Sequence, residues 1–293
     1  MEIRGIIPPV ATPMRPNEDL DLPRFRWFLD HLISEGVHGL FVLGTNSEFY
    51  ALDEGEKQEL IATAVAHVRK RVPVFVGSGA ETTREAVRLT KLAEKEGADG
   101  VSVITPYFVS PNQQEIYDHY RRIAESTSLP VLLYNNPANC GGVKIDIETV
   151  GRLAQISNIL GIKDSSGDLQ NTNECIRAVP QQFSVLQGRD TLIYPSLMFG
   201  ARGAVPASAN VAPAICAEIY NAFARGDHAG AKAAQLRLNP VRLSLALSTH
   251  PGGVKAALAL LGREIGPSRS PIAPLSAEKQ QKMRAMLHEA GLM

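Results

Sequence analysis

Short apolar runs alternate with amphipathic stretches along most of the chain. In residues 82–96, Ala86, Leu89, Leu92 and Ala93 recur at the spacing of one helix face. The apolar runs predict strands at residues 5–10, 39–43, 72–77, 100–104, 129–134, 159–163, 183–186 and 203–205. The amphipathic stretches predict helices at residues 23–35, 53–70, 82–96, 112–125, 146–154, 191–199, 212–225 and, more weakly, 171–178.

The order of these elements indicates an α/β fold. The strands are apolar throughout rather than alternating, so both faces of the sheet are expected to be covered. Eight strand–helix units fit a closed (β/α)8 TIM barrel better than an open doubly wound sheet, which stays the alternative. We therefore expect a barrel over residues 1–225 and a helical extension packed on it over residues 226–293, with breaks near 251–253 and 266–267.

Composition narrows the classes of function. The chain has 293 residues, 44% of them hydrophobic, enough for one large core. Thirty basic residues balance thirty acidic ones without a basic block, which argues against a nucleic-acid partner or an anionic membrane surface. No apolar run reaches about 18 residues, so no membrane span is expected.

The expected location is the cytoplasm. The first residues lack the apolar stretch of a signal peptide. The three cysteines, Cys140, Cys175 and Cys216, are odd in number and widely spaced, which does not suggest a disulfide framework. A reducing compartment is the simpler assumption for such a chain.

The barrel hypothesis selects candidate site residues by location. In an α/β barrel the site lies at the carboxyl ends of the strands. These ends are residues 44–48, 77–79, 105–108, 134–137, 163 and 188–190.

Lys163 is the most informative of these residues. It follows the apolar residues 159–162 and precedes the polar, turn-forming residues 164–168. Burial disfavours the charged form of an amine, so this lysine is expected to act as a nucleophile on a carbonyl substrate. The alternative is a structural lysine that leaves the sheet to meet Asp164 or solvent.

Two further strand ends carry polar groups. Thr45 and Asn46 offer side chains and backbone N–H groups that suit a carboxylate, although a self-bonded turn is the alternative. Tyr134 would place its hydroxyl at the mouth of the barrel, where a nearby cation would help it to transfer a proton. The alternative for Tyr134 is a rim residue that only packs its ring.

Other chemistries are less well supported. The seven histidines fall mostly on predicted helices, none at metal-ligand spacing, and are expected to be surface or packing residues. Residues 77–79 lack the third glycine of a dinucleotide-binding loop. No phosphate-binding loop and no nucleophile elbow occurs.

Four motifs stand in a fixed order along the chain. They are Gly-Thr-Asn-Ser-Glu at 44–48, Tyr-Asn-Asn-Pro at 134–137, Gly-Ile-Lys-Asp at 161–164 and Gly-Ala-Val at 203–205, flanked by segments 5–13 and 266–271. Through them the chain resembles the dihydrodipicolinate synthase / N-acetylneuraminate lyase family nearly end to end. The resemblance implies a (β/α)8 barrel with a helical extension, usually a homotetramer. It also implies a class I aldolase or lyase that binds pyruvate or another 2-oxo acid as a Schiff base, without a metal or organic cofactor.

The resemblance also assigns roles by position. Lys163 matches the lysine that forms the imine, and Tyr134 matches the tyrosine that shuttles protons. Thr45 and Asn46 match the pair that holds the carboxylate of the 2-oxo acid. Gly188 and Val205 match positions that line the pocket, the latter through its backbone carbonyl.

Three departures separate members of the family. Asn139 stands where the synthases have an arginine for the carboxylate of the second substrate, which removes a charge-assisted contact. Phe108 stands where they use a tyrosine from a neighbouring subunit. Ser47 replaces a usual glycine and would be strained if that position required a positive φ.

These departures favour one activity over several alternatives. We expect a lyase resembling the 4-hydroxy-2-oxoglutarate aldolases, which cleaves 4-hydroxy-2-oxo acids to pyruvate and an aldehyde. The first alternative is a dihydrodipicolinate (4-hydroxy-tetrahydrodipicolinate) synthase. A sugar-acid dehydratase or an N-acetylneuraminate lyase-like enzyme is a further alternative, and a catalytically silent paralogue is the alternative without enzyme activity.

Overall fold

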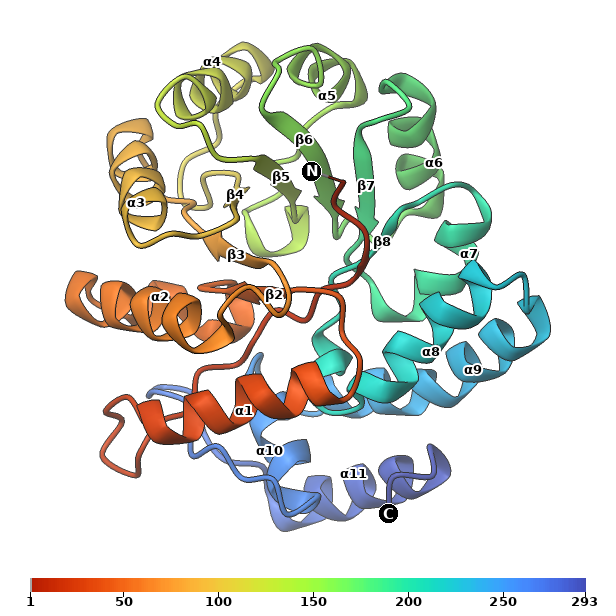
Figure 1. The fold of residues 1–293 in the computed structure, drawn as a ribbon. Helices are drawn as coiled ribbons and strands as arrows, with labels where there is room; N and C mark the ends of the chain where they lie inside the picture. Colours follow the sequence, from red (N-terminus) through yellow and green to blue (C-terminus); the bar gives the residue numbers. More distant parts are fainter. Residues whose placement is uncertain (1) are drawn as a thin grey trace.

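Eight parallel strands form the centre of the molecule, surrounded by helices (Figure 1). The computed structural model describes residues 2–293. The strands are β1 (Gly5–Ile6), β2 (Leu40–Val42), β3 (Val74–Gly77), β4 (Gly100–Ile104), β5 (Val131–Asn135), β6 (Ile159–Asp164), β7 (Ser184–Gln187) and β8 (Gly203–Ala204). Each strand from β2 to β7 pairs with the next in sequence, and β8 pairs with β1. The (β/α)8 barrel expected from the sequence is therefore confirmed.

The barrel closes between β1 and β2 through a short contact. Pro9 forms an isolated parallel bridge with Phe41, and the amide of Val10 donates to the carbonyl of Phe41 at 2.8 Å. The strand predicted at residues 5–10 is shorter than expected because Pro8 and Pro9 have no N–H to donate to a ladder.

The helices on the outside follow the strands in alternation. They are α1 (Leu22–Ser34), α2 (Glu54–Val68), α3 (Thr83–Lys95), α4 (Gln113–Ala124), α5 (Ile147–Leu153), α6 (Leu169–Ala178), α7 (Ile193–Met198) and α8 (Pro213–Ala224). Side-chain caps set the starts of α1, α2, α3, α4 and α6, as in α2, where Asp53 and Glu56 form a reciprocal capping box. The weakly predicted helix at 171–178 begins earlier, because Asp168 caps α6 by accepting from the amide of Gln170.

Both faces of the sheet are buried. The large core between strands and helices contains most buried apolar side chains. A second, smaller cluster contains Ile3, Ile7, Phe41, Phe75, Leu132, Leu186 and Val205. Leu132 lies two residues before Tyr134, and Leu186 pairs in register with Lys163, so this cluster lies on the side of the sheet to which both candidate residues point.

The carboxyl-terminal segment adds three helices. They are α9 (His228–Leu245), α10 (Gly252–Leu260) and α11 (Ala277–Glu289), and α9 packs beside α8 (Figure 1). The interruption expected near 251–253 covers residues 246–251, so Gly253 lies inside α10. Among residues 2–293, no helix combines the length and the apolar character needed to cross a bilayer.

Five short 3-10 helices, which the pattern did not predict, occupy four loops between strands and helices. They are η1 (Thr45–Ser47), η2 (Phe49–Ala51), η3 (Pro137–Asn139), η4 (Asp190–Leu192) and η5 (Ala207–Asn210). The helix predicted at 191–199 is thus divided between η4 and α7. Four of the five follow a strand directly or within three residues, so they shape the carboxyl end of the barrel.

Candidate active site

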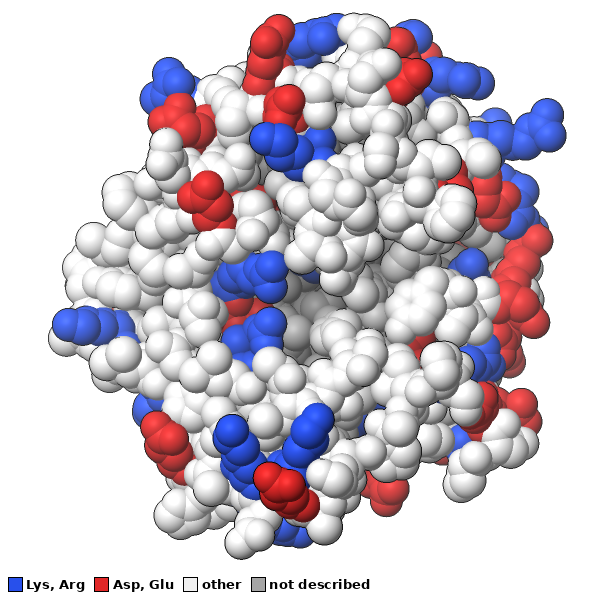
Figure 2. All heavy atoms as spheres, turned by 180° about the vertical axis from the view of Figure 1, so that it is seen from behind, with Lys and Arg blue, Asp and Glu red and all other residues white. Residues whose placement is uncertain are grey.

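A pocket lies at the carboxyl ends of the strands and has a volume of about 160 Å³. This is below the roughly 300–1,000 Å³ typical of sites for drug-sized ligands, so it suits a small metabolite. The face opposite to that of Figure 1 is hollowed near its centre, with basic side chains along one edge of the hollow (Figure 2). All seven candidate residues line the pocket: Thr45, Asn46, Tyr134, Asn139, Lys163, Gly188 and Val205.

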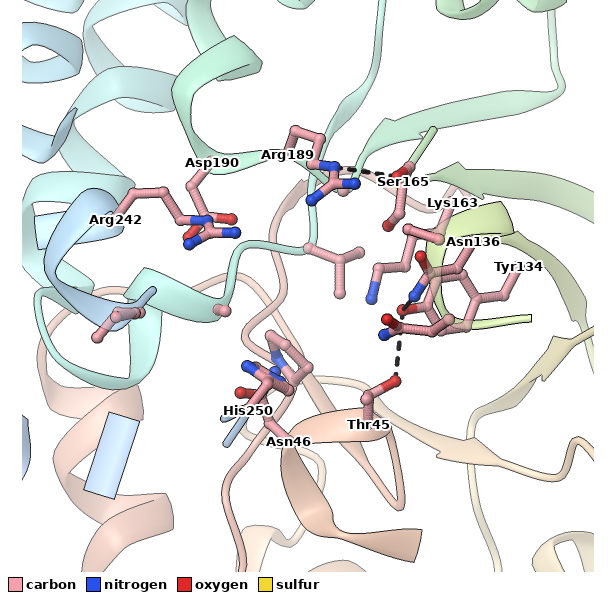
Figure 3. Close-up of a pocket in the computed structure, with 17 residues that line it drawn as sticks. Thr45, Asn46, Tyr134, Asn136, Lys163, Ser165, Arg189, Asp190, Arg242 and His250 are labelled. Carbon is pink, nitrogen blue, oxygen red and sulfur yellow. Dashed lines mark hydrogen bonds between the residues drawn. The ribbon is translucent and has the colours of Figure 1, made fainter. Parts of the chain in front are cut away.

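Lys163 and Tyr134 are neighbours because of the strand register. Lys163 of β6 pairs with Tyr134 of β5, so both side chains leave the sheet at the same level and on the same side. The Nζ atom of Lys163 lies 4.0 Å from the centroid of the Tyr134 ring and 5.4 Å from that of Phe41. Lys163 is only 4% exposed, and its amine points into the pocket (Figure 3).

Asp164 stabilises the turn after Lys163 instead of pairing with it. Its carboxylate accepts hydrogen bonds from Asn135 at 3.0 Å, Thr172 at 2.8 Å and the Ser166 amide at 3.1 Å. Lys163 forms no salt bridge with a carboxylate in the described part of the chain. The alternative of a lysine directed to Asp164 or solvent is therefore wrong.

The Tyr134 hydroxyl is held by two polar side chains. It accepts a hydrogen bond from Asn136 Nδ2 at 3.0 Å and lies 3.5 Å from the Thr45 hydroxyl (Figure 3). Burial alone would raise the pKa of Tyr134, but the charge of Lys163 and the hydrogen bonds from Thr45 and Asn136 outweigh it and lower this pKa below its usual value. Such a phenol can give up and take back a proton more readily than an isolated one.

The loop that carries Thr45 and Asn46 is built without strain at Ser47. Positive φ falls instead on Glu48, at 57°. The Ser47 hydroxyl donates to the carbonyl of Val10 at 2.5 Å, which anchors the loop to the segment after β1. The concern that Ser47 distorts this loop is therefore wrong.

Asn46 leaves a polar atom available to a ligand. Its side chain is buried, and its amide oxygen has no hydrogen-bond partner within residues 2–293. Because the oxygen and nitrogen of an amide are exchanged by a simple flip, Asn46 can present either a donor or an acceptor to the pocket.

Gly188 is required because the segments that follow β6 and β7 approach each other closely. A Cβ atom there would meet the Ser165 hydroxyl, and the Gly188 amide donates to the carbonyl of Asp164 at 2.7 Å. Asn139, by contrast, is exposed at the end of η3, on the rim of the pocket.

The pattern of the sequence did not single out several residues of the pocket wall. Asn136, Arg189 and Asp190 belong to strand ends that location alone selected, without a role, and Ser165 lies two residues beyond the end selected at Lys163. Arg242, Leu245 and His250 come from α9 and the segment after it, where no linear signal connects them with the barrel mouth. The expectation that the histidines are surface or packing residues is wrong for His250, which tertiary packing brings to the pocket.

Known proteins resemble the chain over its full length. It is 39% identical over 290 residues to the 4-hydroxy-tetrahydrodipicolinate synthase of Syntrophus aciditrophicus (strain SB), covering 99% of both chains. It is 40% identical over 291 residues to the synthase of the same name from Chelativorans sp. (strain BNC1), again covering 99% of both.

These relatives correct the expected activity. The main interpretation, a lyase resembling the 4-hydroxy-2-oxoglutarate aldolases, is wrong, because curated relatives with 36–40% identity over the whole chain are 4-hydroxy-tetrahydrodipicolinate synthases. That interpretation rested on Asn139 and Phe108. Both are exposed, and Asn139 lies on the rim of a pocket whose wall also carries Arg189 and Arg242.

Solved structures agree with the relatives. The dihydrodipicolinate synthase of Thermotoga maritima is 33% identical, with a TM-score of 0.96 and full coverage of both chains. YagE, a prophage protein of E. coli K12 solved in complex with pyruvate, is 33% identical, with a TM-score of 0.95 and 99% coverage of both. The model of the dihydrodipicolinate synthetase family matches residues 2–290. The chain belongs to this family of Schiff-base lyases and aldolases.

Proposed function

We propose that the protein joins pyruvate, held as an imine on Lys163, to L-aspartate semialdehyde, as a 4-hydroxy-tetrahydrodipicolinate synthase does. The observation that carries the proposal is the placement of a buried lysine amine 4.0 Å from the ring of a tyrosine whose hydroxyl is already hydrogen-bonded. The names of the full-length relatives give the product, 4-hydroxy-tetrahydrodipicolinate, and joining pyruvate to L-aspartate semialdehyde with loss of water yields a compound of that composition.

The first half of the reaction uses Lys163 as a nucleophile. Its amine attacks C2 of pyruvate, and loss of water leaves a protonated imine. Thr45 and Asn46 bind the carboxylate of pyruvate, the latter through the polar atom it leaves unpaired. Tyr134, having given a proton to the departing water, takes one from C3, which leaves an enamine with the imine nitrogen as the electron sink.

The second half forms a carbon–carbon bond. C3 of the enamine attacks the aldehyde carbon, and the new alkoxide takes a proton from Tyr134. The amine of the semialdehyde then attacks C2, displaces Lys163 and closes the ring. Tyr134 regains its proton from that amine through the network it shares with Thr45 and Asn136.

Borohydride trapping tests the first half. Incubation with pyruvate and borohydride should add the mass of a reduced pyruvate adduct to the peptide that contains Lys163. Absence of the adduct would identify a catalytically silent paralogue. The second half is tested by adding L-aspartate semialdehyde to untreated enzyme and following pyruvate consumption. If the protein forms the adduct in the first experiment but consumes no pyruvate in the second, the synthase activity alone is contradicted.

We also propose a homotetramer located in the cytoplasm. Phe108 and Val109 expose apolar surface after β4, and Leu236 and Leu243 do so on α9, which offers two separate surfaces for symmetric contacts. The three cysteines are buried and unpaired, as is usual in a reducing compartment. Light scattering should give about four times the chain mass of 31.7 kDa, and a mass of one chain would refute the tetramer.

A further inference from the structure

Two guanidinium groups line the pocket and form no salt bridge with a carboxylate of the described residues, 2–293. Arg189 follows β7, and its Nε donates to the carbonyl of Ser165 at 3.0 Å, which fixes the direction of the side chain. Arg242 lies on α9 and forms no hydrogen bond or salt bridge through its side chain among residues 2–293. Both side chains are half-buried, so their charges are only partly screened by solvent.

Arg242 and Lys163 lie on opposite sides of the cavity. In Figure 3, Arg242 extends from one side, Lys163 and Tyr134 lie on the other, and Arg189 projects between them. Of the two residues proposed to hold the carboxylate of pyruvate, Thr45 lies 3.5 Å from the Tyr134 hydroxyl, and Asn46 follows Thr45 in η1. A second carboxylate on a molecule that reacts at the imine therefore extends toward the arginines.

Neighbouring groups leave the positive charge of this wall largely uncompensated. Among residues 2–293, Asp190 is the only acidic residue that lines the pocket, and its carboxylate already accepts from the amide of Ser208 at 2.7 Å and from the Ser208 hydroxyl. Burial, followed by the charges of Arg242 and Lys163, lowers the pKa of His250 to about 4, so His250 is neutral at pH 7. The wall thus favours an anion.

We propose that Arg189 and Arg242 together bind the carboxylate of the second substrate, the aldehyde. The inference rests on the proposed function and specifies how its second substrate is recognised. Arginine presents donors in a fork that matches a carboxylate, which neither a lysine nor the amide of Asn139 reproduces. Because Arg242 belongs to α9, the carboxyl-terminal extension takes part in substrate specificity.

The test compares four variants with the native enzyme. Arg189→Gln and Arg242→Gln remove each charge while keeping a polar side chain, and Arg242→Lys keeps the charge without the fork. Arg237→Gln is the matched control, because Arg237 is an exposed arginine on the same helix that does not line the pocket. Circular dichroism and thermal unfolding establish that each variant is folded.

The expected result is selective for the aldehyde. Arg189→Gln and Arg242→Gln should each lower kcat/KM for L-aspartate semialdehyde about 10- to 100-fold, as loss of a charge-assisted hydrogen bond does. Arg242→Lys should be intermediate, Arg237→Gln should behave as native, and borohydride trapping of pyruvate should be unchanged in all four. Native values of kcat/KM in both glutamine variants would overturn the proposal.

A binding measurement separates this proposal from the proposed function. Succinate semialdehyde has the same carbon chain and carboxylate but lacks the amine, and it can be titrated into protein carrying trapped pyruvate, or into untreated protein if trapping fails. Binding to native protein that weakens at least tenfold in the two glutamine variants supports the arginine site, even if the synthase reaction is not observed. No binding to native protein, or equal binding to the variants, would overturn the arginine site alone.

Discussion

Lys163 and Tyr134 depend on each other through charge. The amine lowers the pKa of the phenol against the effect of burial, and the phenol ring places electron density close to the amine. Neither strand alone creates this relation, because it arises from the pairing of β5 with β6. A change in either side chain should therefore affect a different step of the same reaction.

Lys163→Ala should abolish turnover and borohydride trapping while the protein remains folded. The lysine supplies the only covalent bond that the proposed mechanism makes to the substrate. Circular dichroism checks the fold, and mass spectrometry checks the adduct. The exposed Lys91→Ala variant is a control that should keep both activities. Turnover by the Lys163 variant at the native rate would rule out the imine mechanism.

Tyr134→Phe should lower kcat by about 10²- to 10⁴-fold, the usual contribution of a positioned proton-transfer group. The ring remains to pack beside Lys163, so trapping of pyruvate should fall less than turnover. Tyr117→Phe on α4 is the control, since Tyr117 packs against Arg152 outside the pocket. Steady-state kinetics would contradict the proton-transfer role if the Tyr134 variant kept native kcat.

At the scale of single residues, the sequence identified a site residue where a reactive side chain stood at the end of a predicted strand. Lys163 and Tyr134 were identifiable because each stands at the end of an apolar strand, where a barrel places its site. Arg242 and His250 were not, because their approach to the mouth depends on how α9 packs against the barrel. No local pattern encodes such a contact.

A buried ion pair links two elements of the fold, the loop that contains η1 (Thr45–Ser47) and helix α10. Glu48, directly after η1, lies 2.7 Å from the Nζ atom of Lys255, and both side chains are almost fully buried. The Glu48 carboxylate also accepts from the amide of Arg269 at 2.9 Å. These contacts connect the loop of Thr45 and Asn46 to the carboxyl-terminal segment.

Glu48→Ala should lower the free energy of unfolding by about 3–5 kcal/mol, because it leaves the Lys255 charge buried without its partner. It should also raise KM for pyruvate, since the pocket loop loses an anchor. The double variant Glu48→Gln, Lys255→Met should recover much of the stability, because it buries no unpaired charge. Urea unfolding checks both, and a double variant no more stable than Glu48→Ala would contradict the coupling.

The order of elements was more predictable than their ends. Eight alternating units could be predicted because burial on both faces produces apolar strands, and helices show their own period. The 3-10 helices η1 to η5 escaped prediction because single turns have no periodicity. β1 ends early because Pro8 and Pro9 lack the N–H groups that a strand ladder requires, although the apolar run continues through them.

At the scale of the whole molecule, the choice between a lyase and a synthase shows that one or two residues do not identify the activity. The lyase hypothesis inferred the second substrate from two positions, Asn139 and Phe108. The pocket instead combines residues from the barrel and from α9, and its charge is the sum of all of them. Full-length similarity samples all of these positions together, and for that reason it corrected the expected activity.

Stability of the whole molecule should depend on pH through its buried histidines. Burial lowers the pKa of His31, His38, His119 and His250, in the last two to about 4. In the unfolded chain these groups bind protons near pH 6.5. Between pH 6.5 and about 4 the unfolded state therefore binds more protons than the folded state, and the free energy of unfolding should fall as the pH falls.

Urea unfolding at fixed protein concentration between pH 7 and pH 4.5 measures this slope. The slope of the unfolding free energy against pH reports the number of protons bound on unfolding. In His119→Gln this number should be smaller by up to about one, because the variant no longer has a buried imidazole whose protonation favours unfolding. Carboxylates with a lowered pKa, such as Glu56 and Asp30, act in the same direction but mainly below about pH 4.5, since both titrate below their ordinary values. Equal slopes in the native protein and the His119 variant would mean that this imidazole is protonated in the folded state.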